Sequence, residues 1–287
     1  MLDTSMLAFL APCFAASLIL AGIHAYLGVH VVERGVIFVD LSLAQIAALG
    51  ATIALLLPIS NGDPHAPVVY WISLAFTFMG AFIFSTIRSK RARIPHEAII
   101  GICYAVASAA SILAMSKATS ESEHLKDMLV GNILAVSWSD VGKTALLYGA
   151  VGIFHFVFRH KFLAISMDPQ RAEAEGISIK LWDFLFYASF GFVVTSSVSI
   201  AGVLLVFCYL IVPSVGAMLY AETIGRRLAI GWSMGTIVSA VGVYASLQLD
   251  LPTGATIVCT FGIALIIMAL VRPFIRRAAA QPLAMMR

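Results

Sequence analysis

A chain of 287 residues in which 61% are hydrophobic and only 11% are charged cannot cover itself with a water-facing surface, because soluble domains carry roughly 25% charged residues. The composition therefore excludes a soluble enzyme and predicts an integral membrane protein. The net charge is only +3, and the Lys and Arg residues lie in short connecting segments, a pattern that argues against a nucleic-acid-binding protein.

Nine segments are long enough to cross a bilayer, which requires roughly 20 apolar residues per helix. We therefore expect one all-α transmembrane domain covering residues 1–287, with about nine helices. The sixth and seventh spans form one continuous apolar stretch, which Gly202 is expected to break. The predicted spans are 5–27, 35–58, 67–87, 97–116, 138–158, 181–200, 203–220, 228–248 and 254–271.

Short basic segments indicate the orientation of these spans, because cytoplasmic loops are enriched in Lys and Arg. With nine spans, all of these segments fall on one side of the membrane. The N-terminus is then predicted outside the cell and the C-terminus in the cytoplasm. The basic segments are 88–93 (RSKRAR), 159–161 (RHK), 225–227 (GRR) and 272–277 (RPFIRR).

Residues 128–141 (MLVGNILAVSWSDV) are too short and too interrupted by polar residues to span the membrane. Irregular backbone at membrane depth is tolerated only where protein or a water-filled cavity covers it. The segment predicts either a short re-entrant helix that lines a pathway or a helix that lies on the membrane surface.

A second short helix is predicted on the cytoplasmic side, after Asp168. Asp168 suits the N-cap, because its side chain can accept a hydrogen bond from one of the first backbone N–H groups, which have no partner within the helix. Pro169 suits the first helical position, because proline has no backbone N–H that would need a partner there. Gly176 suits the helix stop. Taken alone, this helix is either a solvated connector or an element that docks on a partner.

Polar residues inside the second span are the main candidates for function. A carboxylate in hydrocarbon costs on the order of 3 kcal/mol, so Asp40 requires an explanation. His24, near the end of the first span, is expected at a comparable depth, and one hypothesis is that His24 and Asp40 approach each other. Alternatively, Asp40 accepts a hydrogen bond from a nearby serine or backbone amide, and His24 reaches the membrane interface.

Glu97 and Ser197 each allow two interpretations, one structural and one functional. Glu97 begins the fourth span and is read either as a cap of its own first turn or as a gate. Ser197 belongs to a group of small hydroxyl residues that either pack helices closely or line the pathway. His30 and Arg34 lie in the first cytoplasmic connection and are expected to be solvated.

At residues 168–177 the sequence DPQRAEAEGI resembles the D-P-x-x-A-x-x-x-G-[IV] signature of the permease subunits of bacterial ABC importers for zinc, manganese and related metals. Four further stretches resemble the same family in the same order, so the resemblance covers nearly the whole chain. They are HEAIIGICYAVASAASIL, LVGNILAVSWSDV, IAGVLLVFCYLIVPSVGAMLYAE and LDLPTGATIV.

The resemblance implies a type II-like permease, distantly similar to those of siderophore and cobalamin importers, in the bacterial cytoplasmic membrane. It implies a homodimer, a cytoplasmic ATPase dimer that carries ATP and magnesium, and a periplasmic or lipid-anchored metal-binding protein. The helix after Asp168 would be the coupling helix, where the small residues Ala172 and Gly176 allow the ATPase to approach. The chain lacks the G-x-x-x-x-G-K-[ST] loop, so it is expected to be no enzyme and to hold no cofactor.

The substrate implied is a divalent transition metal moved by alternating access, with zinc favoured over manganese and iron. The family's second span carries G-D-A-x-S-H, whose Asp and His share one helix face. Here the stretch reads VDLSLAQIAALG: Gln45 takes the histidine position and Asp40 falls one place before the aspartate. Five residues correspond to roughly 140° around a helix, so these two side chains cannot form that pair. Asp40 and His24 are then the candidate metal ligands.

A secondary transporter driven by an ion gradient is the alternative function. Such transporters often contain internal repeats. The nine predicted spans show no convincing repeat, and this alternative leaves the segment 168–177 unexplained.

Overall fold

In the computed structural model of the chain, the structure describes residues 4–60, 63, 66–87, 94–116 and 133–284. The residues so described form helices, turns and short connections, with no strand among them. The helices are α1 (Thr4–Glu33), α2 (Val39–Leu56), η1 (Pro58–Ser60), α3 (Pro67–Ile87), α4 (His96–Met115), η2 (Ile133–Ala135), α6 (Trp138–Val157), α7 (Arg159–Met167), α8 (Pro169–Ala174), α9 (Ile179–Met218), α10 (Ile224–Leu249) and α11 (Thr253–Ala284).

The all-α membrane class predicted from the sequence is confirmed. Within the described ranges, seven helices are long and apolar enough to cross a membrane, or eight if the pair α6 and α7, bent by 73°, counts as one broken span. The 40 residues of α9 hold both the sixth and the seventh predicted spans. The break at Gly202 is confirmed, since its φ of 76° and ψ of 160° belong to a region that essentially only glycine adopts.

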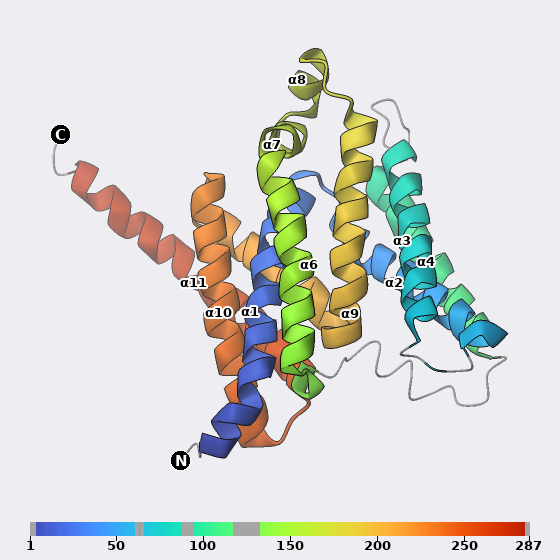
Figure 1. The fold of residues 1–287 in the computed structure, drawn as a ribbon. Helices are drawn as coiled ribbons and strands as arrows, with labels where there is room; N and C mark the ends of the chain where they lie inside the picture. The colour runs from blue at the N-terminus through green and yellow to red at the C-terminus, as the bar shows by residue number, and fades with distance from the viewer. Residues whose placement is uncertain (1–3, 61–62, 64–65, 88–93, 117–132, 285–287) are drawn as a thin grey trace.

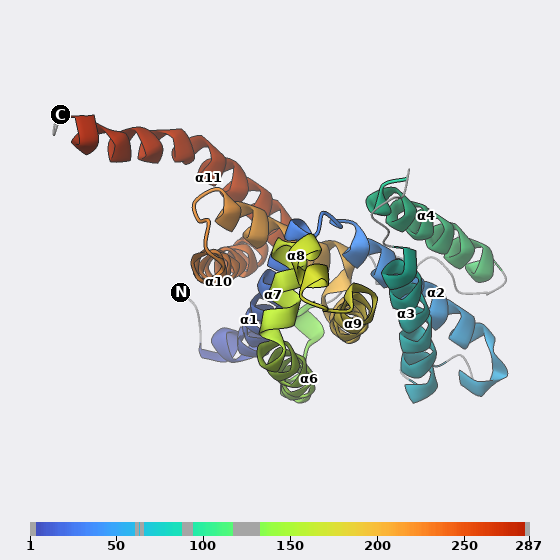
Figure 2. The same cartoon turned by 90° about the horizontal axis from the view of Figure 1, so that it is seen from above.

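The helices form three groups (Figures 1 and 2). On one side α2 packs against α3 and α4, and on the opposite side α10 packs against α11. Between them, α1 and α9 pack against each other and against α6. The short helices α7 and α8 lie at one end of the bundle, and the N-terminal end of α1 lies at the other (Figure 1).

Local sequence signals set several helix ends. The end of α1 is closed at Gly35, whose φ is 65°, by hydrogen bonds from Gly35 N to Val32 O and from Val36 N to Val31 O. At the start of α6, the Ser137 and Asp140 side chains form a capping box. Of the short helix predicted over 128–141, the part from Trp138 onward belongs to α6, Ile133–Ala135 form the separate short helix η2, and residues 128–132 lie outside the described part, so a re-entrant or surface position stays a prediction.

Small residues allow the central helices to approach closely, as membrane helices do where apolar attraction between them is weak. The clearest case is Gly28 on α1, where an added Cβ would overlap the carbonyl oxygen of Leu210 and Oγ of Ser214 on α9. Ser214 Oγ also donates hydrogen bonds to the carbonyls of Leu210 (2.9 Å) and Ala25 (3.3 Å). The crossing of α1 and α9 therefore depends on the absence of a side chain at Gly28.

We expect Gly28→Ala to lower the stability of the protein, because the extra methyl must push α1 away from α9. Overpacking of this kind costs about 1–3 kcal/mol. Gly22→Ala on the same helix is the matched control, since a Cβ there meets nothing within 4 Å. Thermal unfolding in detergent micelles measures both variants. Equal unfolding temperatures for the two variants would contradict the assigned crossing.

Candidate translocation and coupling site

The turn at α8, which the resemblance predicts as a coupling helix and which we call the coupling turn, has the local structure that the sequence predicts. Asp168 is the N-cap, and its side chain accepts a hydrogen bond from Arg171 N (3.0 Å) with Pro169 at the first helical position. Gly176 ends the helix with a φ of 81°. Hydrogen bonds from Gly176 N to Glu173 O and from Ile177 N to Ala172 O close this end. The turn is thus fixed by its own residues before any partner binds.

One predicted contact residue of this turn faces inward. Ala172 is fully buried and belongs to the hydrophobic core, so its small side chain lets α8 pack on its own chain, whereas the sequence analysis placed it against an ATPase. The outer side of the turn is formed by Arg171, Glu173 and Glu175, all exposed. Arg171 Nε pairs with the Glu175 carboxylate at 2.9 Å.

Below this turn lies a buried set of polar side chains that we call the coupling-end cluster: His30, Arg34, Ser166 and Asp183. Arg34 Nη1 lies 2.7 Å from Asp183 Oδ1, and both side chains are 0% exposed. Arg34 Nε also donates to Ser166 Oγ (2.9 Å). The cluster therefore ties the end of α1 to α7 and α9.

The hydrogen bonds at Ser166 can be assigned from its single hydroxyl proton. Ser166 Oγ donates to Phe162 O (2.9 Å), so it accepts from Arg34 Nε and from Nδ1 of His30 (2.8 Å). The prediction that His30 and Arg34 are solvated is wrong. Their distant partners on α7 and α9 could not be read from the local sequence.

A second layer, which we call the middle bridge, consists of Tyr26, His155 and Ser189. The Tyr26 hydroxyl lies 3.3 Å from Nδ1 of His155, and Nε2 of His155 lies 2.8 Å from Ser189 Oγ. The His155 ring stacks on Phe162 at 4.3 Å between ring centres. This bridge joins α1, α6 and α9 with polar bonds inside an aromatic layer.

The third layer, the mid-span cluster, consists of His24, Tyr148, Ser196 and Ser197. The Tyr148 hydroxyl lies 2.5 Å from Ser197 Oγ and accepts from Ser196 Oγ (3.0 Å). Ser197 Oγ also lies 2.6 Å from Val193 O and 3.3 Å from Nε2 of His24. Ser197 is therefore held in a helix-packing network, and its proposed place on a substrate pathway is not tested by this geometry.

The hydrogen bonds of His24 run to Leu20 and Ser197. Its Nδ1 lies 2.8 Å from Leu20 O, a group that only accepts, so Nδ1 carries the proton. In a neutral imidazole this leaves Nε2 as the only nitrogen able to bind a metal, and Nε2 faces Ser197 on α9. No hydrogen bond joins His24 to Asp40 in the part of the chain that is described.

Asp40 lies in the first turn of α2 and is only 1% exposed. Its Oδ1 is buried and has no hydrogen-bond partner among the described residues, and neither has Oγ of Ser42. The helix N-terminus favours its negative charge but does not satisfy the oxygen. Gln45 is half-buried on the same helix. A buried carboxylate oxygen without a donor requires a specific explanation, such as an ordered water or a bound ion.

Glu97 does not cap its own helix, which is one of the two roles predicted for it. Its Oε1 accepts a hydrogen bond from Phe38 N (2.9 Å), so it binds the backbone just before α2 instead of capping its own helix α4. The two helices pack against each other, which brings the first turn of α4 to the start of α2. Glu97 thus holds the helix that carries Asp40, and its gating role stays a prediction.

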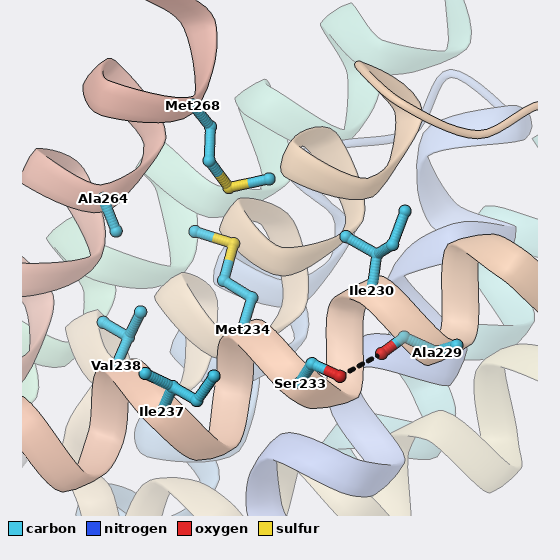
Figure 3. A pocket seen from close by; sticks show the side chains of 8 residues that line it. All are labelled: Ala229, Ile230, Ser233, Met234, Ile237, Val238, Ala264 and Met268. Carbon is cyan, nitrogen blue, oxygen red and sulfur yellow. Dashed lines mark hydrogen bonds between the residues drawn. The ribbon is translucent and has the colours of Figure 1, made fainter. Parts of the chain in front are cut away.

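A groove of about 410 Å³ lies between α10 and α11, and Figure 3 shows Met234 and Met268 extending into it. Ser233 has the one hydroxyl in its lining, and this hydroxyl donates to Ala229 O (2.8 Å). A space walled by methionine and aliphatic side chains suits an apolar group and offers a hard cation no ligand. Searched over the described residues, the chain contains no group of three or more His, Cys, Asp or Glu that could hold a metal.

Tyr148, His155 and Asp183 belong to the buried polar layers but were not predicted from the sequence. The burial of Asp183 could have been suspected from the sequence, because it is a charged residue at the start of a predicted span, 181–200. Tyr148 and His155 carried no such signal, since either side chain can end at a membrane interface without a buried partner.

Comparison with known proteins gives consistent matches. A family model described as the ABC 3 transport family matches residues 6–272. The manganese transport system membrane protein MntC of Listeria monocytogenes is 28% identical over 202 residues, which cover 68% of this chain and 71% of the relative. The chelated iron transport system membrane protein YfeC of Yersinia pestis is 25% identical over 250 residues, which cover 87% and 82%.

The fold also matches a solved structure. A chain of PsaBC from Streptococcus pneumoniae in complex with Fab gives a TM-score of 0.75 at 22% identity, covering 91% of this chain and 90% of that chain. At this identity the match concerns the fold, and it extends over nearly all of both chains.

We expect Tyr148→Phe to destabilise the protein, because it removes the hydroxyl that joins Ser196 and Ser197 on α9 to α6. A hydrogen bond between membrane helices is worth about 0.6 kcal/mol on average and up to roughly 1.7 kcal/mol. Tyr244→Phe on α10 is the control, as that side chain is 52% exposed. Thermal unfolding in detergent compares them, and an equal effect of both substitutions would count against the mid-span cluster.

Proposed function

The chain belongs to the ABC 3 transport family, and from this membership we propose that it is the permease that carries a divalent transition metal across the bacterial cytoplasmic membrane by alternating access. The substrate class is supported by one observation above all: the buried Asp40 carboxylate, whose Oδ1 has no hydrogen-bond partner in the described part of the chain. A carboxylate in hydrocarbon is expensive, and a passing cation would offset its charge.

Asp40 would act as a transient ligand during passage. A carboxylate oxygen is a hard ligand, and manganese prefers hard oxygen ligands to soft thiolate ligands. A single carboxylate without neighbouring metal-ligating side chains binds weakly, and weak binding is what conduction requires, because the ion must also leave. His24 and Gln45, named with Asp40 from the sequence, would then border the route instead of closing a tight site around the metal.

Manganese is our first candidate for the metal, followed by iron. This order is supported by the relatives, since MntC is named for manganese and YfeC for chelated iron. Zinc, which the sequence resemblance favoured, has no such support among these relatives and stands third.

The transporter we propose consists of two copies of this chain, a cytoplasmic ATPase dimer that binds ATP and magnesium, and a metal-binding protein that delivers the substrate. The exposed outer side of α8 would dock on the ATPase. With such docking α8 would lie in the cytoplasm and the start of α1 outside, because the two lie at opposite ends of the bundle (Figure 1). Chemistry on ATP would belong to the ATPase, and this chain would supply the route.

ATP-dependent uptake into proteoliposomes that hold the permease, ATPase and delivery protein tests the proposal, with manganese, iron(II) and zinc as substrates. We expect Asp40→Asn to lower uptake by about tenfold or more, because even groups that only support a metal ligand are worth about 10–100-fold. Asp250→Asn is the control: Asp250 is exposed, and asparagine tolerates its left-handed φ of 53°.

Two results would contradict the proposal. Uptake that needs a proton or sodium gradient and no ATP would instead indicate a secondary transporter. Unchanged manganese uptake in Asp40→Asn, with Asp250→Asn also unchanged, would remove Asp40 from the route while leaving the family function intact.

A further inference from the structure

The coupling-end cluster, the middle bridge and the mid-span cluster lie in one continuous seam between α1, α6–α7 and α9. On α1 the seam begins at His24, passes Tyr26 and His30, and ends at Arg34. Ten residues of helix correspond to about 15 Å, so the seam reaches from the coupling end to the middle of the bundle. Each of its three layers joins α9 to α1, and each also contains a residue of α6 or α7: Tyr148, His155 or Ser166.

The seam is unsuited to carry the metal itself. Arg34 places a full positive charge at the coupling end, fully buried and 4.0 Å above the Phe186 ring. A cation moving along the seam would be repelled there, and the repulsion is strong where water is excluded. The unpartnered carboxylate of Asp40 lies on α2, whose neighbours are α3, α4 and α9, and α2 contributes no residue to the seam.

The seam instead connects the coupling turn with the transmembrane helices. The turn α8 packs on α7 and α9, and Ser166 of α7 is bonded to both His30 and Arg34 at the end of α1. Polar bonds in a water-free environment have no solvent to replace them, so breaking them during a movement is costly. We expect α1, α7 and the first half of α9 to move as one body.

We propose that Arg34, Ser166 and Asp183 are positioning residues that pass a displacement of α8 to α1 and α9, and that the polar seam is the mechanical link between ATPase docking and the middle of the transport route. The inference rests on the proposed function, because only a permease driven by a cytoplasmic ATPase needs such a link.

Replacing both members of the Arg34–Asp183 ion pair separates a role in transmitting movement from a role in stability alone. Removing one member of a buried ion pair leaves a lone buried charge, whereas replacing both members by apolar residues of similar size is often neutral or stabilising. We therefore expect Arg34→Met alone to unfold at a lower temperature than wild type, and the double variant Arg34→Met/Asp183→Leu to regain most of that stability. Ser166→Ala is a third variant, which removes only the hydroxyl shared by α1 and α7.

The first readout is metal transported per ATP hydrolysed, measured with manganese in proteoliposomes of the full transporter. We expect Ser166→Ala and the double variant to fold and hydrolyse ATP, while manganese moved per ATP falls at least about fivefold, the lower end of typical coupling effects. The matched control is Glu33→Gln/Arg227→Gln, which removes an ion pair between α1 and α10 outside the seam and should leave the ratio unchanged.

The second readout does not require transport. Spin labels at Ala174 on α8 and Ser199 on α9, both exposed, report the distance across the seam after the four native cysteines are replaced. In the complex with the ATPase we expect one narrow distance distribution that is the same with and without ATP. In the double variant ATP should shift or broaden it, because α8 then moves without α9.

Two results would overturn the proposal: a stable double variant that keeps the full ratio of manganese to ATP, which makes the ion pair purely structural, or a wild-type distance that changes with ATP. Absence of ATP-dependent uptake of any metal in wild type would count against the proposed function alone, since the distance measurement would still decide whether the seam moves as one body.

Discussion

A charge buried away from water must find its partner within the protein, because an isolated buried charge is very costly. In this chain the ion pair between Arg34 and Asp183 meets that requirement, and much of the architecture follows from it. Arg34 can reach Asp183 only if the end of α1 lies beside the start of α9. The bonds from Arg34 and His30 to Ser166 then fix α7 on the same pair of helices. The coupling turn α8, which follows α7 directly, is thereby placed at the end of a helix group that is bonded together internally.

The buried polar groups fall into two classes, those that are hydrogen-bonded across helices and those that have an atom without a partner among the described residues. In the polar seam they are bonded across helices, and the described contacts of Tyr148 and Ser197 leave little freedom for an ion. On α2 the Asp40 carboxylate has a buried oxygen without a donor. A satisfied network makes a group of helices rigid, and an unsatisfied carboxylate attracts a cation. This separation fits the roles proposed for the two parts, since a part that transmits movement should not trap the substrate.

Several residues that the sequence marked as interesting have roles that depend on helix packing. Glu97 binds the backbone before α2, Ala172 faces the core, and the free nitrogen of His24 faces α9. In each case the residue type was informative, because a charged or small residue at that place needed a reason. The partner was not predictable, because it lies 59 residues along the chain for Glu97 and 173 for His24.

The sequence by itself determined the features that depend on neighbouring residues: the apolar spans, the break at Gly202, the capped turn from Asp168 to Gly176, and the family to which the chain belongs. The spans, the break and the turn follow from hydrophobic length, backbone conformation and capping, which act over a few residues, and the family follows from motifs quoted directly from the sequence. Only the tertiary structure decided which charges and hydroxyls meet. In a membrane that choice depends on which helices cross closely enough to bond, and close crossings such as Gly28 against Leu210 arise from packing between distant segments.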